Sequence, residues 1–406
     1  MRTLLITGPG GSGRTTIAAA TALRAAGTGT RTLVLSADRT DTLGAALGTA
    51  TGPTPVGITP ALTAWRPDAA ERFRDDLTAF QTRAATVLDL LGTDRLDAEE
   101  LTPLPGADEL SFLRALRDAA LSDRYDLLVV DLPPTPQALA LLALPGELRR
   151  YLRRLLPPER QAARALRPVL GRLAGVPMPA EWLYETAARW GVELAAVEAV
   201  VADRDTAVRL VAEPGPAGAD AVRAAGLGLA LSGLRTEALV ANRVLPETDR
   251  DTWPGRPSPD HHPSTSFEPI FLTLVAQQRK TLADWREAYD VHPVAHLGRD
   301  PRGTDDLTTL HVPGTGARPT PVEWQVADRI AADGVLVWHI PLPGAIRDEL
   351  DLIRRGDELV ITAGPFRRLV PLPSALRRCT VAGAALREGE LRIRFAPDPD
   401  LWPRER

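Results

Sequence analysis

The sequence predicts an α/β fold, in which a mostly parallel sheet with a helical insertion is followed by an antiparallel β-sandwich domain. Three observations predict it. Short apolar segments alternate with helical ones over most of the chain, and a glycine-rich loop joins the first strand to the first helix. Beyond about residue 333 the apolar residues alternate with period two. A chain of 406 residues also exceeds what one hydrophobic core usually holds, so two domains are expected.

The core strands are expected at short runs of apolar residues. These runs are Thr3–Thr7, Thr32–Ser36, Leu127–Val130, Val208–Ala212, Ala238–Ala241 and Val294–Leu297. Between the second and third runs, apolar residues recur at helical spacing from Phe73 to Leu91. Further helices are expected at about 148–174, 180–202, 217–231 and 268–289. The pattern predicts a helical subdomain at about 60–122 and 147–203.

Composition narrows the function classes. The formal net charge is −4, which gives no reason to expect nucleic acid as a partner. Cys379 is the only cysteine, so an intrachain disulfide is excluded. No apolar run is long enough to span a bilayer, and the amino-terminal one is too short for a signal peptide. We expect a cytoplasmic protein with at most peripheral membrane contact.

The glycine-rich loop runs from Gly8 to Thr16 and reads GPGGSGRTT. A P-loop reads GxxxxGK[ST]: its backbone N–H groups bind phosphates, its lysine reaches the β and γ oxygens, and its hydroxyl binds Mg²⁺. Here Thr15 supplies the hydroxyl, and Arg14 replaces the lysine. The loop predicts a nucleotide site formed by Gly8, Gly10, Gly11, Ser12, Gly13, Arg14, Thr15 and Thr16.

Two acidic residues follow core strands, Asp38 after the second and Asp131 after the third. Ligands of open α/β sheets bind at the carboxyl ends of strands, so we expect both acids beside the loop. The alternative is that each is a strand-end cap or a member of a surface ion pair. For Asp38 alone that alternative is the better one, and only the order of the motifs favours a site.

Four segments are informative together: the glycine-rich loop, LSADRTD (residues 35–41), DLPPT (131–135) and VANRV (240–244). In these four segments the sequence resembles the arsenite-pump and tail-anchored-protein targeting ATPases. This resemblance spans roughly the first 310 residues and implies ATP and Mg²⁺ as cofactors. It implies that Asp38 positions the attacking water, with Arg14 at the catalytic cation's place. Thr15 and Asp131 would hold Mg²⁺, and Asn242 would contact adenine. The segment His296–Gly303 matches a second base-side loop.

The family's loop reads GKGGxGKTT, and its first lysine reaches the nucleotide across a dimer interface. That lysine aligns with Pro9, which has no charge and no donor. Since Arg14 replaces the second lysine, we expect weak or absent hydrolysis. Three alternatives stay open: an active ATPase, a nucleotide-independent scaffold paired with an active paralogue, and a partition-type ATPase. The length between Asp38 and Asp131 speaks against the last of these.

Partners follow from the resemblance as well. We expect a homodimer, or a heterodimer with a paralogue, whose helical insertions bind an apolar helix of a client protein. From Leu148 to Leu156 an apolar face alternates with arginines, although such a helix more often packs on its neighbours. The absence of cysteines in the insertion makes arsenite an improbable ligand. The adjacent His261 and His262 are more often solvated loop residues than metal ligands.

The carboxy-terminal part resembles the α-crystallin domain of small heat-shock proteins, in the form appended to some ATPases of this family. The residues that carry this resemblance are WHIPLP (338–343), GDELVI (356–361), LP (372–373) and GEL (389–391). We expect the ATPase-like domain at 1–312, a linker at 313–322 and the β domain at 323–406. Because the β strands would complete their own sandwich, residues 1–321 are expected to fold by themselves.

Overall fold

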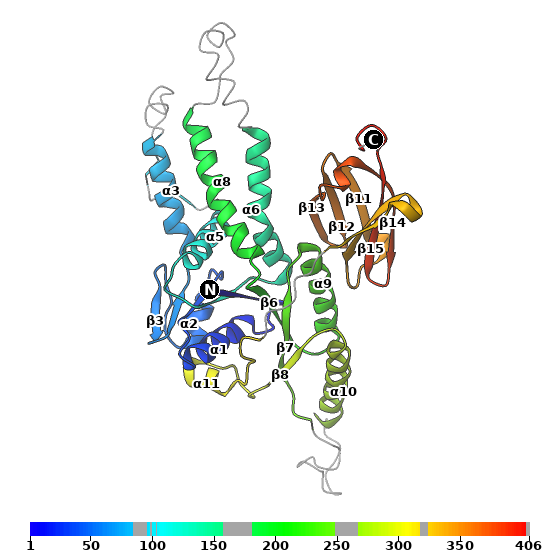
Figure 1. The fold of residues 1–406 in the computed structure, drawn as a ribbon. Helices are drawn as coiled ribbons and strands as arrows, with labels where there is room; N and C mark the ends of the chain where they lie inside the picture. Colours follow the sequence, from blue (N-terminus) through cyan, green and yellow to red (C-terminus); the bar gives the residue numbers. More distant parts are fainter. Residues whose placement is uncertain are drawn as a thin grey trace.

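The protein is described by a computed structural model that covers residues 1–83, 96–97, 100–102, 104–156, 181–247, 267–316 and 324–402. Its larger part is built on an eight-stranded sheet of order β3-β4-β2-β5-β1-β6-β7-β8 (Figure 1). Neighbouring strands are parallel except for β3 and β4, which pair antiparallel. The predicted mostly parallel sheet is confirmed.

Six of these strands are the predicted ones, with small differences at their ends. They are β1 (Arg2–Thr7), β2 (Thr32–Ser36), β5 (Leu127–Asp131), β6 (Thr206–Ala212), β7 (Thr236–Val244) and β8 (Val291–Ala295). The prediction missed β3 (Val56–Thr59) and β4 (Leu62–Trp65), and β4 lies where helix was expected from about residue 60. Their β-branched residues and the prolines before them favour an edge hairpin. Helix begins only at α3 (Ala69–Arg83).

Helices cover both faces of the sheet (Figure 1). On one face α1 (Arg14–Gly27), α2 (Thr42–Leu47) and α11 (Gly303–Thr309) share a core with Leu4 and Ile6. On the other face Leu5 packs with α5 (Ala107–Ala120), α6 (Thr135–Leu155), α8 (Glu181–Ala202), α9 (Pro216–Ser232) and α10 (Phe267–Arg286). Successive side chains of a strand point to opposite faces, so a strand buried on both sides is apolar throughout.

In the described residues the helical insertion comprises α3, α5, α6 and α8, and α3, α6 and α8 extend beyond the sheet (Figure 1). The sequence predicted a helix from about residue 148, whereas α6 begins at Thr135 and continues through Pro145. Parts of the predicted insertion lie outside the described residues, namely 84–95 and 157–180. The loop with His261 and His262 also lies outside them. Among the described helices, none is long and apolar enough to cross a membrane.

The β domain is a sandwich of two antiparallel sheets, as predicted. One sheet has the order β14-β15-β10-β9 and the other β11-β12-β13. The strands are β9 (Val326–Arg329), β10 (Val335–Pro341), β11 (Leu350–Arg355), β12 (Glu358–Ala363), β13 (Phe366–Pro371), β14 (Cys379–Arg387) and β15 (Glu390–Pro397). Trp338, Ile361 and Phe395 lie in the core between the sheets.

The β domain packs on α9 of the larger domain. Leu227 and Leu231 of that helix belong to the hydrophobic core of the β domain and are 6% and 1% exposed. Gly228 lies between them, and a Cβ there would lie 2.8 Å from a ring carbon of Phe366. Arg368 donates a hydrogen bond to the carbonyl of Leu231. The sandwich therefore completes its core with two side chains from outside its own strands.

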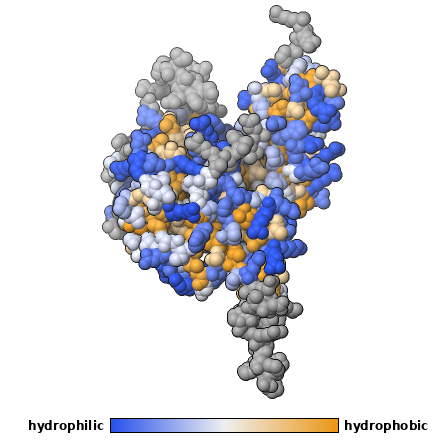
Figure 2. Space-filling model, turned by 60° about the horizontal axis from the view of Figure 1, so that its bottom comes forward, coloured by the Kyte–Doolittle hydropathy of each residue, from blue (hydrophilic) through white to orange (hydrophobic). Residues whose placement is uncertain are grey.

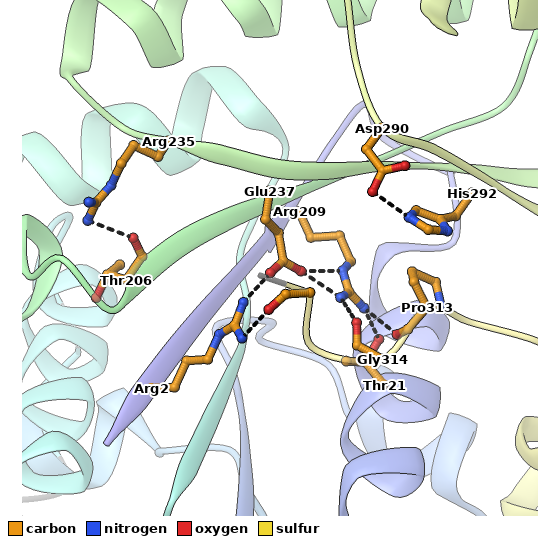
Figure 3. Close-up of polar contacts among 11 residues, drawn as sticks. Arg2, Thr21, Thr206, Arg209, Arg235, Glu237, Asp290, His292, Pro313 and Gly314 are labelled. Atoms are coloured by element: carbon orange, nitrogen blue, oxygen red, sulfur yellow. Dashed lines mark hydrogen bonds and ion pairs between the residues drawn. The ribbon is translucent and has the colours of Figure 1, made fainter. Parts of the chain in front are cut away.

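The segment that leads toward the β domain is held by buried charges (Figure 3). Arg209 on β6 and Glu237 on β7 form an ion pair whose side chains are 0% and 1% exposed. Arg209 also donates to the hydroxyl of Thr21 on α1 and to the carbonyls of Pro313 and Gly314, each within 3.0 Å. The first residues of the expected linker thus lie against the sheet, and residues 317–322 of that linker lie outside the described part.

A chain that ends at Pro321 should still fold, but it should melt at a lower temperature than the full chain. Truncation exposes Leu227 and Leu231, and each buried leucine contributes about 1.5–3 kcal/mol. The double substitution Leu227→Ser with Leu231→Ser should reduce binding of a hydrophobic dye to the truncated chain, while it destabilises the full chain.

Calorimetry of the four proteins measures the melting temperatures, and dye fluorescence measures the binding of the hydrophobic dye. Loss of the cooperative melt on truncation would show that the domain boundary is wrong. An unchanged melting temperature would show that the contact with α9 contributes nothing.

Candidate functional site

The glycine-rich loop connects β1 to α1 at the carboxyl end of the central strands. A Cβ at Gly8 would lie 1.9 Å from the carbonyl oxygen of Val211 on β6, so only glycine fits there. Gly11 and Gly13 have φ of +79° and +84°, the left-handed region that favours glycine. Helix α1 begins at Arg14, so the last three residues of the loop segment form its first turn. This is the strand, loop and helix arrangement of phosphate sites.

Asn242 holds the loop from the end of β7. Its side-chain nitrogen donates to the carbonyl of Ser12 at 2.8 Å, and only 6% of the residue is exposed. A Cβ at Gly13 would lie 2.3 Å from the same nitrogen. The hydroxyl of Ser12 donates in turn to the carbonyl of Pro9 at 2.9 Å. Asn242 therefore supports the loop, and its contact with adenine stays a prediction.

A hollow of about 260 Å³ lies beside the loop. Gly13 and Thr16 line one side of it, α2 contributes Thr42, and β7 contributes Asn242 and Arg243. The segment 295–302 lines the remaining side, so the predicted base-side loop from His296 does adjoin the phosphate loop.

Asp131, at the end of β5, lies buried beside the loop at 3% exposure. Its Oδ2 accepts a hydrogen bond from the hydroxyl of Ser36 at 2.9 Å, while its Oδ1 has no partner among the described residues. Burial raises the pKa of Asp131 to about 6, against the opposing effects of Ser36, Thr15 and Arg14. An unpaired buried carboxylate oxygen fits a cation or its bound water. Thr15 and Asp131 thus suit the Mg²⁺ role that was predicted for them.

Arg14 faces the same place. Its Nη1 is buried and has no partner in the described part of the chain. Burial lowers the pKa of Arg14, while the negative charges of Asp131 and Asp38 raise it. The structure thus brings Arg14 within electrostatic range of both predicted acids. A phosphate group would give the unpaired guanidinium nitrogen an acceptor.

Asp38 is exposed and lies in the turn before α2. Its carboxylate accepts from the hydroxyl of Thr42 at 2.9 Å, and its backbone N–H donates to the hydroxyl of Ser36 at 3.2 Å. Ser36 therefore bridges Asp38 and Asp131. Asp41, where the related family has a histidine, caps α2 by accepting from the N–H of Gly44 at 2.9 Å.

Sequence reasoning did not single out Arg243. Its Nη1 donates to the carbonyl of Gly11 at 3.1 Å, and its guanidinium pairs with Glu213 and, at 3.5 Å, with Asp300. Its φ is +54°. The only signal in the sequence was its position directly after Asn242, because nothing in the residue order reveals a left-handed arginine.

Comparisons with known proteins agree with this geometry. The family of anion-transporting ATPases matches residues 1–256, and an HSP20-like domain found in ArsA proteins matches residues 333–395. An uncharacterized protein of Streptomyces coelicolor is 72% identical over the full length of both chains. A protein of Mycobacterium tuberculosis is 34% identical over 99% of this chain and 97% of its own.

A putative arsenical pump-driving ATPase of Aquifex aeolicus is 26% identical over 97% of this chain and 99% of its own. One matched range contains the phosphate loop and both strand-end acids, and the other contains the sandwich from β10 into β15. The chain belongs to the ArsA family of anion-transporting ATPases and carries that family's HSP20-like domain.

Proposed function

We propose that this protein binds Mg-ATP at the loop of residues 8–16 and couples the nucleotide state to the binding of an apolar client, with slow or absent hydrolysis. One observation carries the binding part. Asp131 and Arg14 each keep a buried polar atom without a partner among the described residues, beside a loop whose backbone requires glycine at positions 8, 11 and 13. Buried unpaired groups destabilise a fold, and Mg²⁺ with phosphate would supply the missing partners of both.

Bound ATP and Mg²⁺ would bring the phosphoryl chemistry, and the chain's residues would position it. Backbone N–H groups of the loop would bind phosphate oxygens, Thr15 and Asp131 would hold the cation's shell, and Asp38 would orient water. Transfer of a phosphoryl group needs cations on its equatorial oxygens, and a cation supplied in trans contributes about 10³–10⁵ in rate. Pro9 cannot supply one. Arg14 keeps its charge, but its planar fork does not match the point charge of lysine.

Two alternatives, an active ATPase and a pseudo-ATPase, are supported by different residues, the first by Asp38. A carboxylate is present at this position, which favours an ATPase that still works, although the link to Asp131 through Ser36 uses only the backbone N–H of Asp38. Pro9 and Arg14 favour a pseudo-ATPase, acting as a scaffold or beside an active paralogue. We favour weak hydrolysis because the family's trans-acting lysine has no equivalent at position 9 in either subunit of a homodimer.

The name of the Aquifex relative refers to an arsenical pump, but the donor set for arsenite is missing here. Arsenic prefers thiolates, and the whole chain has one cysteine, Cys379, which is buried in the β domain. An apolar client suits the projecting helices better. Tyr151 and Leu155 on α6 and Val192 on α8 are 48%, 75% and 72% exposed. On the face turned forward in Figure 2, by contrast, apolar patches are interspersed with polar residues.

Mg-ATP should raise the melting temperature of the protein, while its turnover stays near background. The double change Pro9→Lys with Arg14→Lys should increase turnover, because lysines at both positions restore about 10³-fold or more of cation catalysis. Phosphate release and thermal shift measure the two effects. Asp38→Asn in the double variant is the control and should abolish the gain. Turnover typical of the family in the unaltered protein would contradict the pseudo-ATPase assignment.

Asp131→Asn should stabilise the nucleotide-free protein near pH 7.5. The pKa of Asp131 is raised from 3.8 to about 6, so the folded state loses stability as the pH rises between these values and bears the full cost above them. At 1.36 kcal/mol per pKa unit the cost is about 3 kcal/mol. Denaturant melts at pH 7.5 and 4.5 measure the gain, which should shrink at the lower pH. An equal gain at both values would contradict this origin.

The protein should dimerise across the nucleotide face, as a homodimer or with a paralogue. Gly10 is exposed and has open space around its Cβ position, so Gly10→Trp should fold and yet prevent dimerisation. Gly57→Trp, also in open space but on β3, is the matched control. Light scattering with and without Mg-ATP measures the mass. A monomer under every condition, also when mixed with a paralogue, would contradict the dimer.

A further inference from the structure

Arg243 lies at an irregularity in β7 that turns its side chain toward the phosphate loop. The register between β7 and β8 shifts between Ala241 and Val244, so the residues between them form a bulge. Within the shift Arg243 has φ +54°. Bulges beside active sites redirect side chains, and strained backbone clusters at functional sites. Among the described residues, the other non-glycine with positive φ is Glu388, which lies in the turn between β14 and β15.

The bulge binds two consecutive carbonyls of the loop with two consecutive side chains. Asn242 donates to the carbonyl of Ser12 at 2.8 Å, and Arg243 donates to that of Gly11 at 3.1 Å. The loop carbonyls are thereby held on the side of β7. Arg243 also lines the hollow that Gly13 and Thr16 border, so its guanidinium adjoins both the loop and that hollow.

The charges around Arg243 hold it at the loop without burying it. Glu213, directly after β6, and Asp300 pair with it, and 39% of its side chain is exposed. Arg299 and Arg302 line the same hollow; the guanidinium of Arg299 donates to Asp306, whereas Arg302 donates to it through its backbone N–H. A guanidinium has five N–H donors in a planar fork that matches phosphate oxygens. Arg243 thus has donors to offer a ligand in addition to its bond to Gly11.

We propose that Arg243 is a phosphate-binding residue of this site and supplies, from within the same subunit, positive charge that position 9 of the loop lacks. Its ligand is the polyphosphate of a nucleotide, and its contact is a charge-assisted hydrogen bond to a phosphate oxygen. This inference rests on the proposed nucleotide binding. It needs no partner subunit, because the strand end and the loop belong to one chain.

Calorimetric titration of full-length variants with ATP, ADP and adenosine tests the proposal. Arg243→Ala should weaken ATP and ADP binding by about tenfold to a hundredfold, the usual effect of losing a charged hydrogen bond. Adenosine, which has no phosphate, should bind with the same affinity to both proteins. Arg243→Lys should retain part of the affinity. Arg223→Ala on α9, which removes another surface arginine paired with a carboxylate, is the control and should bind like the unaltered protein.

The outcomes separate this proposal from the function on which it rests. If the unaltered protein binds no ATP, both fail. If it binds ATP but Arg243→Ala binds equally well, the proposal is overturned and nucleotide binding stands. If Arg243→Ala loses adenosine as strongly as ATP, the residue only supports the loop and the proposal is also overturned. Should the alanine variant not fold, Arg243→Gln keeps the length of the side chain and is read in the same way.

Discussion

The ion pair between Arg209 and Glu237 is the interaction on which the packing of β6, β7, α1 and residues 313–314 depends. A buried charge is tolerated only when its partners are complete. Arg209 donates two hydrogen bonds to Glu237, at 3.0 and 2.5 Å. It also donates to the hydroxyl of Thr21 and to the carbonyls of residues 313–314. Removing any one of these acceptors would leave an N–H of a buried guanidinium unpaired. The pair therefore fixes β6, β7, α1 and residues 313–314 relative to one another.

The phosphate site differs from this cluster, because its buried charged groups do not have all their partners. Asp131 ends β5 and Arg14 begins α1, and each keeps a buried atom without a partner in the described chain. Buried hydrogen bonds are strong, so the complete set around Arg209 stabilises the fold. For the same reason the incomplete set around Arg14 and Asp131 favours binding of a ligand, since the ligand would make the bonds that the protein lacks. The raised pKa of Asp131 has the same cause, because burial disfavours its charged form until a cation is near.

The sequence predicted those features that local pattern determines. Short apolar runs located six of the eight strands of the large sheet, and the spacing of Gly8 and Gly13 located the phosphate loop, since each glycine is required by backbone geometry at its own position. Features that depend on distant parts of the chain were missed. Leu227 and Leu231 look like ordinary apolar residues of α9, and only the tertiary fold shows that they belong to the core of another domain.

Arg209 and Arg243 were missed for a related reason. In a chain with one lysine, arginine carries nearly every positive charge, so the residue type says little about the role. Arg209 stands within an apolar strand, where its burial could have been suspected but its partners could not. Arg243 differs from its neighbours by its backbone angle alone. The role of each is visible only from its bonds to residues that are distant in the sequence.

The phosphate loop and residues 313–314, which lead toward the β domain, are both connected to β6 and α1. Val211, whose carbonyl adjoins Gly8, lies two residues after Arg209 on β6, and Thr21 lies on the helix that the loop begins. A displacement of α1 relative to β6 would therefore break the bond from the buried guanidinium of Arg209 to Thr21, and the same guanidinium also binds residues 313–314. An unsatisfied buried donor costs about 1–3 kcal/mol. Because this exceeds thermal energy, the bonds of Arg209 oppose such a displacement.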